Sequence, residues 1–205
     1  MRYIPETKII GKYRIDIIQD EVPEDPREWG NATKMVFCHR GYNLGDEHDY
    51  KSDNYGNWGE LKEAIIANED VHTICPVYMM DHSGLSFSTN RYGGMYGYFD
   101  SGQIGYMLVT NKEAKDNGWD EERCFEAIEL DLETYGQYIS GDVYGYTITE
   151  IDEDGDDIEE VESCWGYYGT DSTMEEAEEI VECLIKKDKE NEIKLQADTY
   201  SAMGG

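Results

Sequence analysis

Residues 143–168, VYGYTITEI-DEDGDD-IEEVESCWGYY, determine the expected fold more than any other stretch. Two runs that alternate apolar and polar residues, 143–151 and 158–168, flank a short acidic turn sequence. An Asp-Gly pair between two such runs is a strong short-range signal for a β-hairpin. The stretch therefore predicts two neighbouring antiparallel strands.

Helical patterns lie on both sides of this hairpin. Before it, a helix is expected to start at Asp120, and its apolar side is formed by Cys124, Phe125, Ile128, Leu132 and Tyr135. After it, Ser172 or Thr173 is expected to cap a further helix whose last turn holds Lys186, Lys187 and Lys189. The carboxylates of residues 120–122 suit the first turn of the earlier helix, because the helix dipole favours negative charge there.

The rest of the chain supplies more strands and one more helix. Strands are expected at 13–18, 34–39, 72–80 and 104–110, and a helix at 58–67. Pro76 marks an edge or a bulge, since proline cannot donate to a strand ladder. We therefore expect an α+β fold with a mixed or antiparallel sheet and about three helices. It should form a single compact domain over residues 1–190, followed by a flexible tail over 191–205.

Charge is the strongest compositional feature. The 205 residues hold 46 acids and 17 Lys or Arg, a formal net charge of −29. Such a chain is not expected to bind nucleic acid or a membrane directly, because phosphate backbones and anionic lipids attract positive surfaces. The 17 Tyr and four Trp supply the large apolar faces that a folded core needs.

The acids are concentrated in one segment. Residues 124–185 contain 20 acids and no Lys or Arg. From Asp120 to Glu133, seven acids and one Arg follow a helix of about 21 Å, so the net charge is about one per 3.5 Å. That spacing is close to the phosphate spacing along one DNA strand. Solubility or adaptation to high salt would scatter the acids over the chain, so the concentration favours a binding surface.

We therefore predict an acidic segment, 120–182, that binds a partner with a basic groove. Six of the predicted contact residues lie on the helix before the hairpin, and these are Asp120, Glu121, Glu122, Glu126, Glu129 and Glu133. The hairpin adds Asp152, Asp154, Asp156, Asp157, Glu159 and Glu160, and the following helix adds Glu175, Glu176 and Glu179. A row of carboxylates at this spacing can compete with nucleic acid for its binding site.

An enzyme is the main alternative. Cys38, His82 and Cys164, with His39 and Asp81 nearby in sequence, offer the thiol, imidazole and carboxylate that a small cytosolic hydrolase would use. No nucleophile elbow or phosphate-binding loop accompanies them, and we do not expect catalysis. A third alternative is a binding module whose acidity is incidental.

No cofactor or metal is expected either. The pair His72 and Cys75 lacks a second pair with zinc-ligand spacing, and Gly155 stands at the wrong position for an EF-hand loop. The five cysteines are widely spaced and odd in number, which favours reduced thiols over a disulfide framework. With no apolar run of membrane-spanning length, we expect a soluble protein of the cytoplasm. The sequence leaves open whether it is a monomer or a homodimer.

Several short motifs stand out, and they are HRGYNLGD at 39–46, DHSG at 81–84, DSGQ at 100–103, ETYGQY at 133–138, GDVYG at 141–145 and SCWGYYG at 163–169. Together they resemble those of a family of uncharacterised proteins from phages and conjugative elements. The resemblance covers about residues 36–169, and it departs from the family pattern at Tyr98 and Phe99, where a Trp is expected.

This resemblance implies a setting more than a chemistry. An origin in mobile elements implies a bacterial host cytoplasm, where small acidic proteins act as DNA mimics against restriction, CRISPR or similar defences. The expected function is thus anti-defence: an acidic mimic that inhibits a host DNA- or RNA-binding defence protein by occupying its basic groove.

Overall fold

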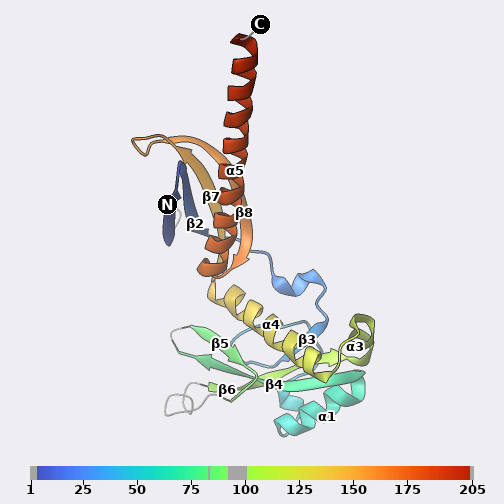
Figure 1. Cartoon of the computed structure of the whole chain (residues 1–205). Helices are drawn as coiled ribbons and strands as arrows, with labels where there is room; N and C mark the ends of the chain where they lie inside the picture. Colours follow the sequence, from blue (N-terminus) through green and yellow to red (C-terminus); the bar gives the residue numbers. More distant parts are fainter. Residues whose placement is uncertain (1–3, 83, 92–100, 204–205) are drawn as a thin grey trace. The chain divides into compact units, whose positions relative to one another are not determined.

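The structure is a computed structural model that describes residues 4–82, 84–91 and 101–203 (Figure 1). The chain divides into two compact units. Unit 1 comprises Met1–Pro23 and Gly141–Gly205, and unit 2 comprises Glu24–Ser140. The predicted domain over 1–190 thus contains two units, and the first of them is built from both ends of the chain.

Unit 1 contains an antiparallel sheet with the strand order β1-β2-β7-β8. The strands are β1 (Glu6–Ile10), β2 (Tyr13–Gln19), β7 (Val143–Ile151) and β8 (Asp157–Tyr168). The hairpin predicted from 143–168 is confirmed, since β7 pairs with β8 in antiparallel register. At its turn the Asp152 side chain accepts the backbone N–H groups of Asp154 and Asp156, and Gly155 adopts a φ of 88°.

Helix α5 (Thr170–Met203) covers one face of this sheet (Figure 1). Its Met174, Ala177 and Val181 pack on a core built from β2 and β7, which includes Ile15 and Ile148. Two expectations about this helix are wrong. It starts at Thr170, and the Ser172 and Thr173 hydroxyls donate to carbonyls of the preceding turn instead of capping it. It also continues past Lys189 to Met203, so the predicted tail is helical there.

Unit 2 is a sheet between two helices (Figure 1). Its strand order is β3-β6-β4-β5, all antiparallel, with β3 (Thr33–Phe37), β4 (Val71–Asp81), β5 (Leu85–Ser88) and β6 (Ser101–Thr110). Helix α4 (Glu121–Ser140) packs on one face through Cys124, Ile128, Leu132 and Tyr135. Helix α1 (Trp58–Asn68) covers the other face through Leu61 and Ile65.

The α+β class and the antiparallel pairing are confirmed. The described residues contain one α-helix more than the three expected, because the short α3 (Asn111–Asn117) precedes α4. Strands β1 and β5 and the 3₁₀ turns η1 (Pro26–Trp29) and η2 (Ser52–Asn54) were also not predicted. An edge or a bulge was predicted at Pro76, and β4 shows a register shift just beyond this proline, between Val77 and Tyr78. No helix in the described part of the chain combines the length and the apolar character needed to cross a membrane.

Candidate acidic interface

Helix α4 carries a row of exposed acids, as predicted. Its N-cap is Asp120, whose side chain accepts the backbone N–H of Arg123 at 3.0 Å. Cys124, Ile128, Leu132 and Tyr135 are buried against the sheet, whereas the predicted acids of this helix are exposed. We call the six exposed carboxylates of this helix the α4 row, namely Asp120, Glu121, Glu122, Glu126, Glu129 and Glu133. All six belong to unit 2.

Two side-chain contacts to the α4 row are seen among the residues that the structure describes. Arg123 forms an ion pair with Glu126, and the Thr89 hydroxyl donates to Glu129 at 3.1 Å. Both contacts lie at the surface, where an ion pair contributes little to stability. These two contacts therefore leave most of the negative charge of the row available for a partner.

The N-terminal half of the α4 row borders a groove of about 760 Å³ beside strand β4. It is lined by Thr73, Ile74 and Cys75 from β4 and by Asp120, Glu121, Glu122, Phe125 and Glu126 from the start of α4. Burial, followed by the nearby charge of Glu129, raises the pKa of the Cys75 thiol to about 12. This thiol is therefore neutral at physiological pH, and the charge of the groove comes from carboxylates alone.

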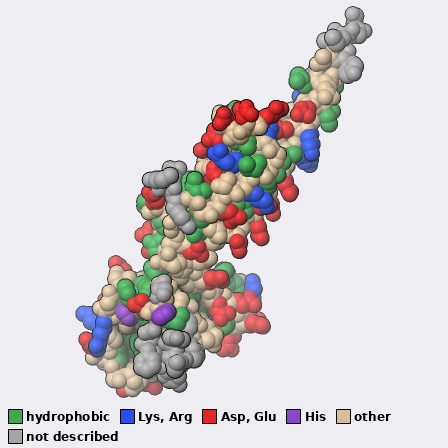
Figure 2. All heavy atoms as spheres, turned by 90° about the vertical axis from the view of Figure 1, so that its left-hand side faces the viewer, with side chains coloured by type: hydrophobic (Ala, Val, Ile, Leu, Met, Phe, Trp, Pro, Cys, Tyr) green, Lys and Arg blue, Asp and Glu red, His purple; other side chains and the backbone are tan. Residues whose placement is uncertain are grey.

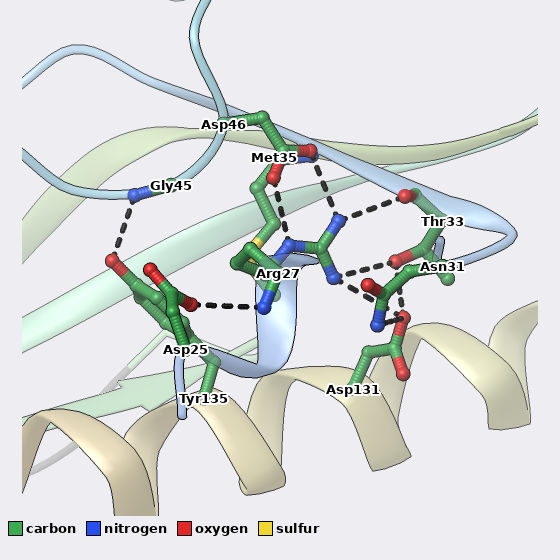
Figure 3. A network of polar contacts seen from close by, with 9 residues as sticks. All are labelled: Asp25, Arg27, Asn31, Thr33, Met35, Gly45, Asp46, Asp131 and Tyr135. Carbon is green, nitrogen blue, oxygen red and sulfur yellow. Dashed lines mark hydrogen bonds and ion pairs between the residues drawn. The ribbon is translucent and has the colours of Figure 1, made fainter. Parts of the chain in front are cut away.

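A buried arginine ties α4 to the loops beside it (Figure 3). Arg27 of η1 donates two hydrogen bonds to Asp46, at 2.7 and 2.9 Å, and a longer one to Asp131 of α4, at 3.3 Å. Burial opposes the charge of Arg27, but Asp46 and Asp131 outweigh it and raise its pKa. The Thr33 hydroxyl also donates to Asp131, and the Tyr135 hydroxyl accepts the Gly45 N–H at 2.8 Å. The helix that carries the acidic row is thus held in place by a polar network.

The other predicted acids lie in unit 1, so the prediction covers two surfaces and not a single helix face. We call these acids the hairpin–α5 surface, and they are Asp152, Asp154, Asp156, Asp157, Glu159, Glu160, Glu175, Glu176 and Glu179. All are exposed except Glu176, which is half-buried. Figure 2 shows acidic side chains on the surface of each unit.

Sequence reasoning missed the bases that pair with acids of unit 1. The 124–185 segment has no Lys or Arg of its own, but β1, β2 and the turn between them bring Lys8, Lys12 and Arg14 to it. Lys8 pairs with Glu178, and Lys12 with Glu150 and Asp188, while Arg14 donates two hydrogen bonds to Asp157.

These contacts change the electrostatics of the acids that they reach. The hydrogen bonds from Arg14 hold the pKa of Asp157 below its ordinary value. Asp157 is therefore already paired, and the hairpin–α5 surface is less available to a partner than its sequence indicates. The missing signal was long-range strand pairing, since β2 lies beside β7 despite a separation of more than a hundred residues.

The Cys38 and His39 region forms a second cavity, of about 800 Å³, within the loop from Phe37 to Asp53. The Cys38 thiol contacts the Tyr50 carbonyl at 3.7 Å, and burial raises its pKa. His39 Nδ1 accepts the backbone N–H groups of Gly41 and Tyr42, at 3.1 and 3.2 Å. The Tyr42 hydroxyl donates to Asp81 at 2.9 Å, which joins this loop to the end of β4.

In the part of the chain that the structure describes, the predicted Cys and His side chains are not brought together in one site. Among the described residues, Cys38 has no hydrogen bond to His82, and Cys164 lies in unit 1, on β8. A raised thiol pKa also works against a cysteine nucleophile, because the thiolate is the reactive form. His72 contacts the buried Cys124 at 3.6 Å, and no group of three or more metal-ligating side chains occurs in the part of the chain described. The hydrolase alternative stays a prediction.

Comparisons with protein-family models, with curated proteins and with solved structures gave no match. The resemblance to proteins of phages and conjugative elements therefore stays a prediction. Two of its motif residues, Ser83 and Asp100, and the departure at Tyr98 and Phe99 lie outside the described residues.

Proposed function

We propose that this protein is an anti-defence protein encoded by a phage or mobile element. It inhibits a host defence protein by acting as an acidic nucleic-acid mimic. It binds the basic groove of a host DNA- or RNA-binding defence protein and blocks nucleic acid from that site. The observation that carries the proposal is the α4 row, six exposed carboxylates on one helix that is anchored by its buried side.

Carboxylates and phosphates compete for the same Lys and Arg side chains of a basic groove. The Lys and Arg of a basic groove displace the counterions that gather around closely spaced phosphates, and a row of fixed carboxylates at similar spacing exploits the same effect. A fixed row is better suited than a disordered acidic tail, because less conformational entropy is lost on binding. Helix α4 meets this requirement through its packed core and the contact between Arg27 and Asp131.

The hairpin–α5 surface supports the proposal less strongly. Lys8, Lys12 and Arg14 already neutralise part of unit 1, including Asp157. The strongest contribution to binding is therefore expected from unit 2.

The test is capture of nucleic-acid-binding proteins from a bacterial lysate on the immobilised chain. We expect capture to weaken steeply between low and high salt and to be competed by duplex DNA. The variant Glu122→Lys, Glu126→Lys, Glu129→Lys should reduce capture at least about tenfold, because it reverses three charges of the row.

A charge-matched control separates the row from the net charge. The variant Glu47→Lys, Asp49→Lys, Glu63→Lys changes the charge by the same amount at exposed positions on the loop and on α1. It should capture the same proteins as the unmodified chain. Equal loss in both variants, or normal capture by the first, would contradict the proposal.

A further inference from the structure

Strand β4 has an open edge along its first half. In the sheet order β3-β6-β4-β5, strand β5 pairs only with the residues from Tyr78 to Asp81. Along residues 71–77, no strand in the described part of the chain pairs on the side of β4 away from β6. An unpaired edge is a template for the addition of another strand.

The hydrogen bonds of β3, at the other edge of the sheet, determine which backbone groups of β4 point outward. Met35 of β3 donates its N–H to the Asp46 carboxylate at 2.8 Å, and its carbonyl accepts the Asp46 N–H at 3.1 Å. Both backbone groups of Met35 therefore face away from β6. Successive residues face opposite sides, so Val36 faces β6 and its register partner Tyr106 faces β3.

The same alternation continues to β4. Met107 follows Tyr106 and so faces β4, where its register partner is Cys75. Ile74 and Pro76, on either side of Cys75, then direct their backbone groups to the open edge. Pro76 agrees with this assignment, because a residue without an N–H costs no ladder bond at an outward position. The edge thus offers the N–H and C=O of Ile74 and the C=O of Pro76.

This edge lies in the groove that the α4 row borders. Ile74 lines the groove together with Asp120, Glu121, Glu122 and Glu126. Phe125, which is 37% exposed, adds an apolar surface between the acids. Backbone groups, negative charge and an aromatic side chain therefore converge on one site.

We propose that the β4 edge binds an extended peptide segment of a partner protein by strand addition, and that this segment carries Lys or Arg at alternate positions. Side chains alternate across a strand, so one set faces α4 and meets its carboxylates while the backbone pairs with Ile74 and Pro76. Charge selects this occupant. Nucleic acid is repelled by the acids, and a second copy of the chain would bring two α4 rows together.

The inference goes beyond the proposed function. Mimicry of nucleic acid requires only charge at a given spacing, whereas strand addition requires backbone hydrogen bonds at one edge. The two can therefore fail separately.

The test uses the full chain and a ten-residue peptide of alternating Lys and Val, with affinity measured by fluorescence anisotropy. Two analogues are N-methylated, one at every Lys and the other at every Val. One analogue should bind like the parent, and the other, which loses the N–H groups facing β4, should bind at least about tenfold more weakly. Amide hydrogen exchange of Ile74 should slow when the parent peptide saturates the protein.

A paired charge variant locates the site. Glu121→Lys with Glu122→Lys should weaken the parent peptide, and Glu47→Lys with Asp49→Lys should not. Equal affinity for both methylated analogues would overturn strand addition, even if the proteins captured from lysate still dissociate with salt. Dimerisation of the free chain that protects the Ile74 amide would also overturn it. Loss of the salt-dependent capture alone would instead contradict the mimic.

Discussion

Arg27 links helix α4 to the loops of unit 2. Its side chain is 8% exposed and lies between two carboxylates from distant parts of unit 2, Asp46 and Asp131. Loss of the guanidinium would leave both acids without this counter-charge. Sequence patterns do not identify this residue, since an arginine in a loop with prolines resembles any surface base.

We predict that Arg27→Met lowers the free energy of unfolding by about 3 kcal/mol, because removal of one partner from a buried ion pair leaves uncompensated charge. The measurement is urea unfolding followed by circular dichroism. As a control, Arg123→Met removes the exposed pair with Glu126 and should change stability by less than about 1 kcal/mol. Similar losses in both variants would show that the network does not anchor α4.

Asp188 makes the stability of the protein depend on pH. Asp188 of α5 accepts hydrogen bonds from the Tyr13 hydroxyl at 2.7 Å and from Lys12, and these hold its pKa below its ordinary value. A carboxylate with a lowered folded pKa stabilises the fold above its unfolded pKa, and this stabilisation is lost as pH falls through the folded value. The stability difference between the unmodified chain and Asp188→Asn should therefore be largest near neutral pH.

That difference should shrink below about pH 4, where aspartates protonate. The comparison is made by urea unfolding at several pH values, with Glu190→Gln as a control for removal of one exposed acid from the same helix. A difference that is constant down to pH 2 would contradict the linkage.

Among the elements, the β7–β8 hairpin depends both on its alternating sequence pattern and on a close contact between its two strands. Gly145 of β7 lies opposite Trp165 of β8, and a Cβ at Gly145 would come within 2.4 Å of the indole ring. The glycine is therefore required by the tryptophan that covers it. Helix α5, by contrast, continues beyond the sheet with exposed side chains such as Ile193 and Leu195.

We predict that Gly145→Ala destabilises the protein by about 1–3 kcal/mol, as overpacking does elsewhere. Combination with Trp165→Ala should recover part of the loss, although the Cys164 carbonyl also lies close, at 2.6 Å. Thermal unfolding measures both effects. Gly102→Ala, at a position with open space, serves as the control and should be nearly neutral. Full additivity of the two changes would show that the ring is not the obstacle.

At the scale of the whole molecule, the charge is shared between the units. Unit 1 contains 24 acids and eight Lys or Arg, and unit 2 contains 22 acids and nine, so the net charges are −16 and −13. The acids of residues 124–185 are close together in the sequence, but the fold divides them between the two units. Residues 124–140 belong to unit 2 and residues 141–185 to unit 1. Each unit has its own hydrophobic core.

We predict that residues 24–140 fold on their own, because this segment is continuous and contains the complete β3-β6-β4-β5 sheet with both covering helices. The expected result is a cooperative unfolding transition and dispersed amide resonances. Residues 141–205 alone should not fold, since β1 and β2 would be missing from the sheet. A disordered 24–140 fragment would contradict the division.

Local physics accounts for what could be predicted from the chain itself. The Asp-Gly turn between alternating runs predicted the β7–β8 hairpin. Helical spacing predicted the buried and acidic sides of α4, except for Phe125, which was expected on the buried side and is exposed. These features depend on residues close together in sequence, where turn preference and side-chain periodicity act directly.

Long-range pairing accounts for the rest. The insertion of β2 beside β7, the bases that it brings to the acids and the ion pair between Arg27 and Asp131 all join distant residues. The groove likewise exists because β5 ends short of the first half of β4, next to the start of α4. No periodic pattern encodes such contacts, because they depend on which surfaces bury one another when the chain collapses. The acidity was therefore predictable from composition, whereas the groove in which it meets an open strand edge emerged only from the folded arrangement.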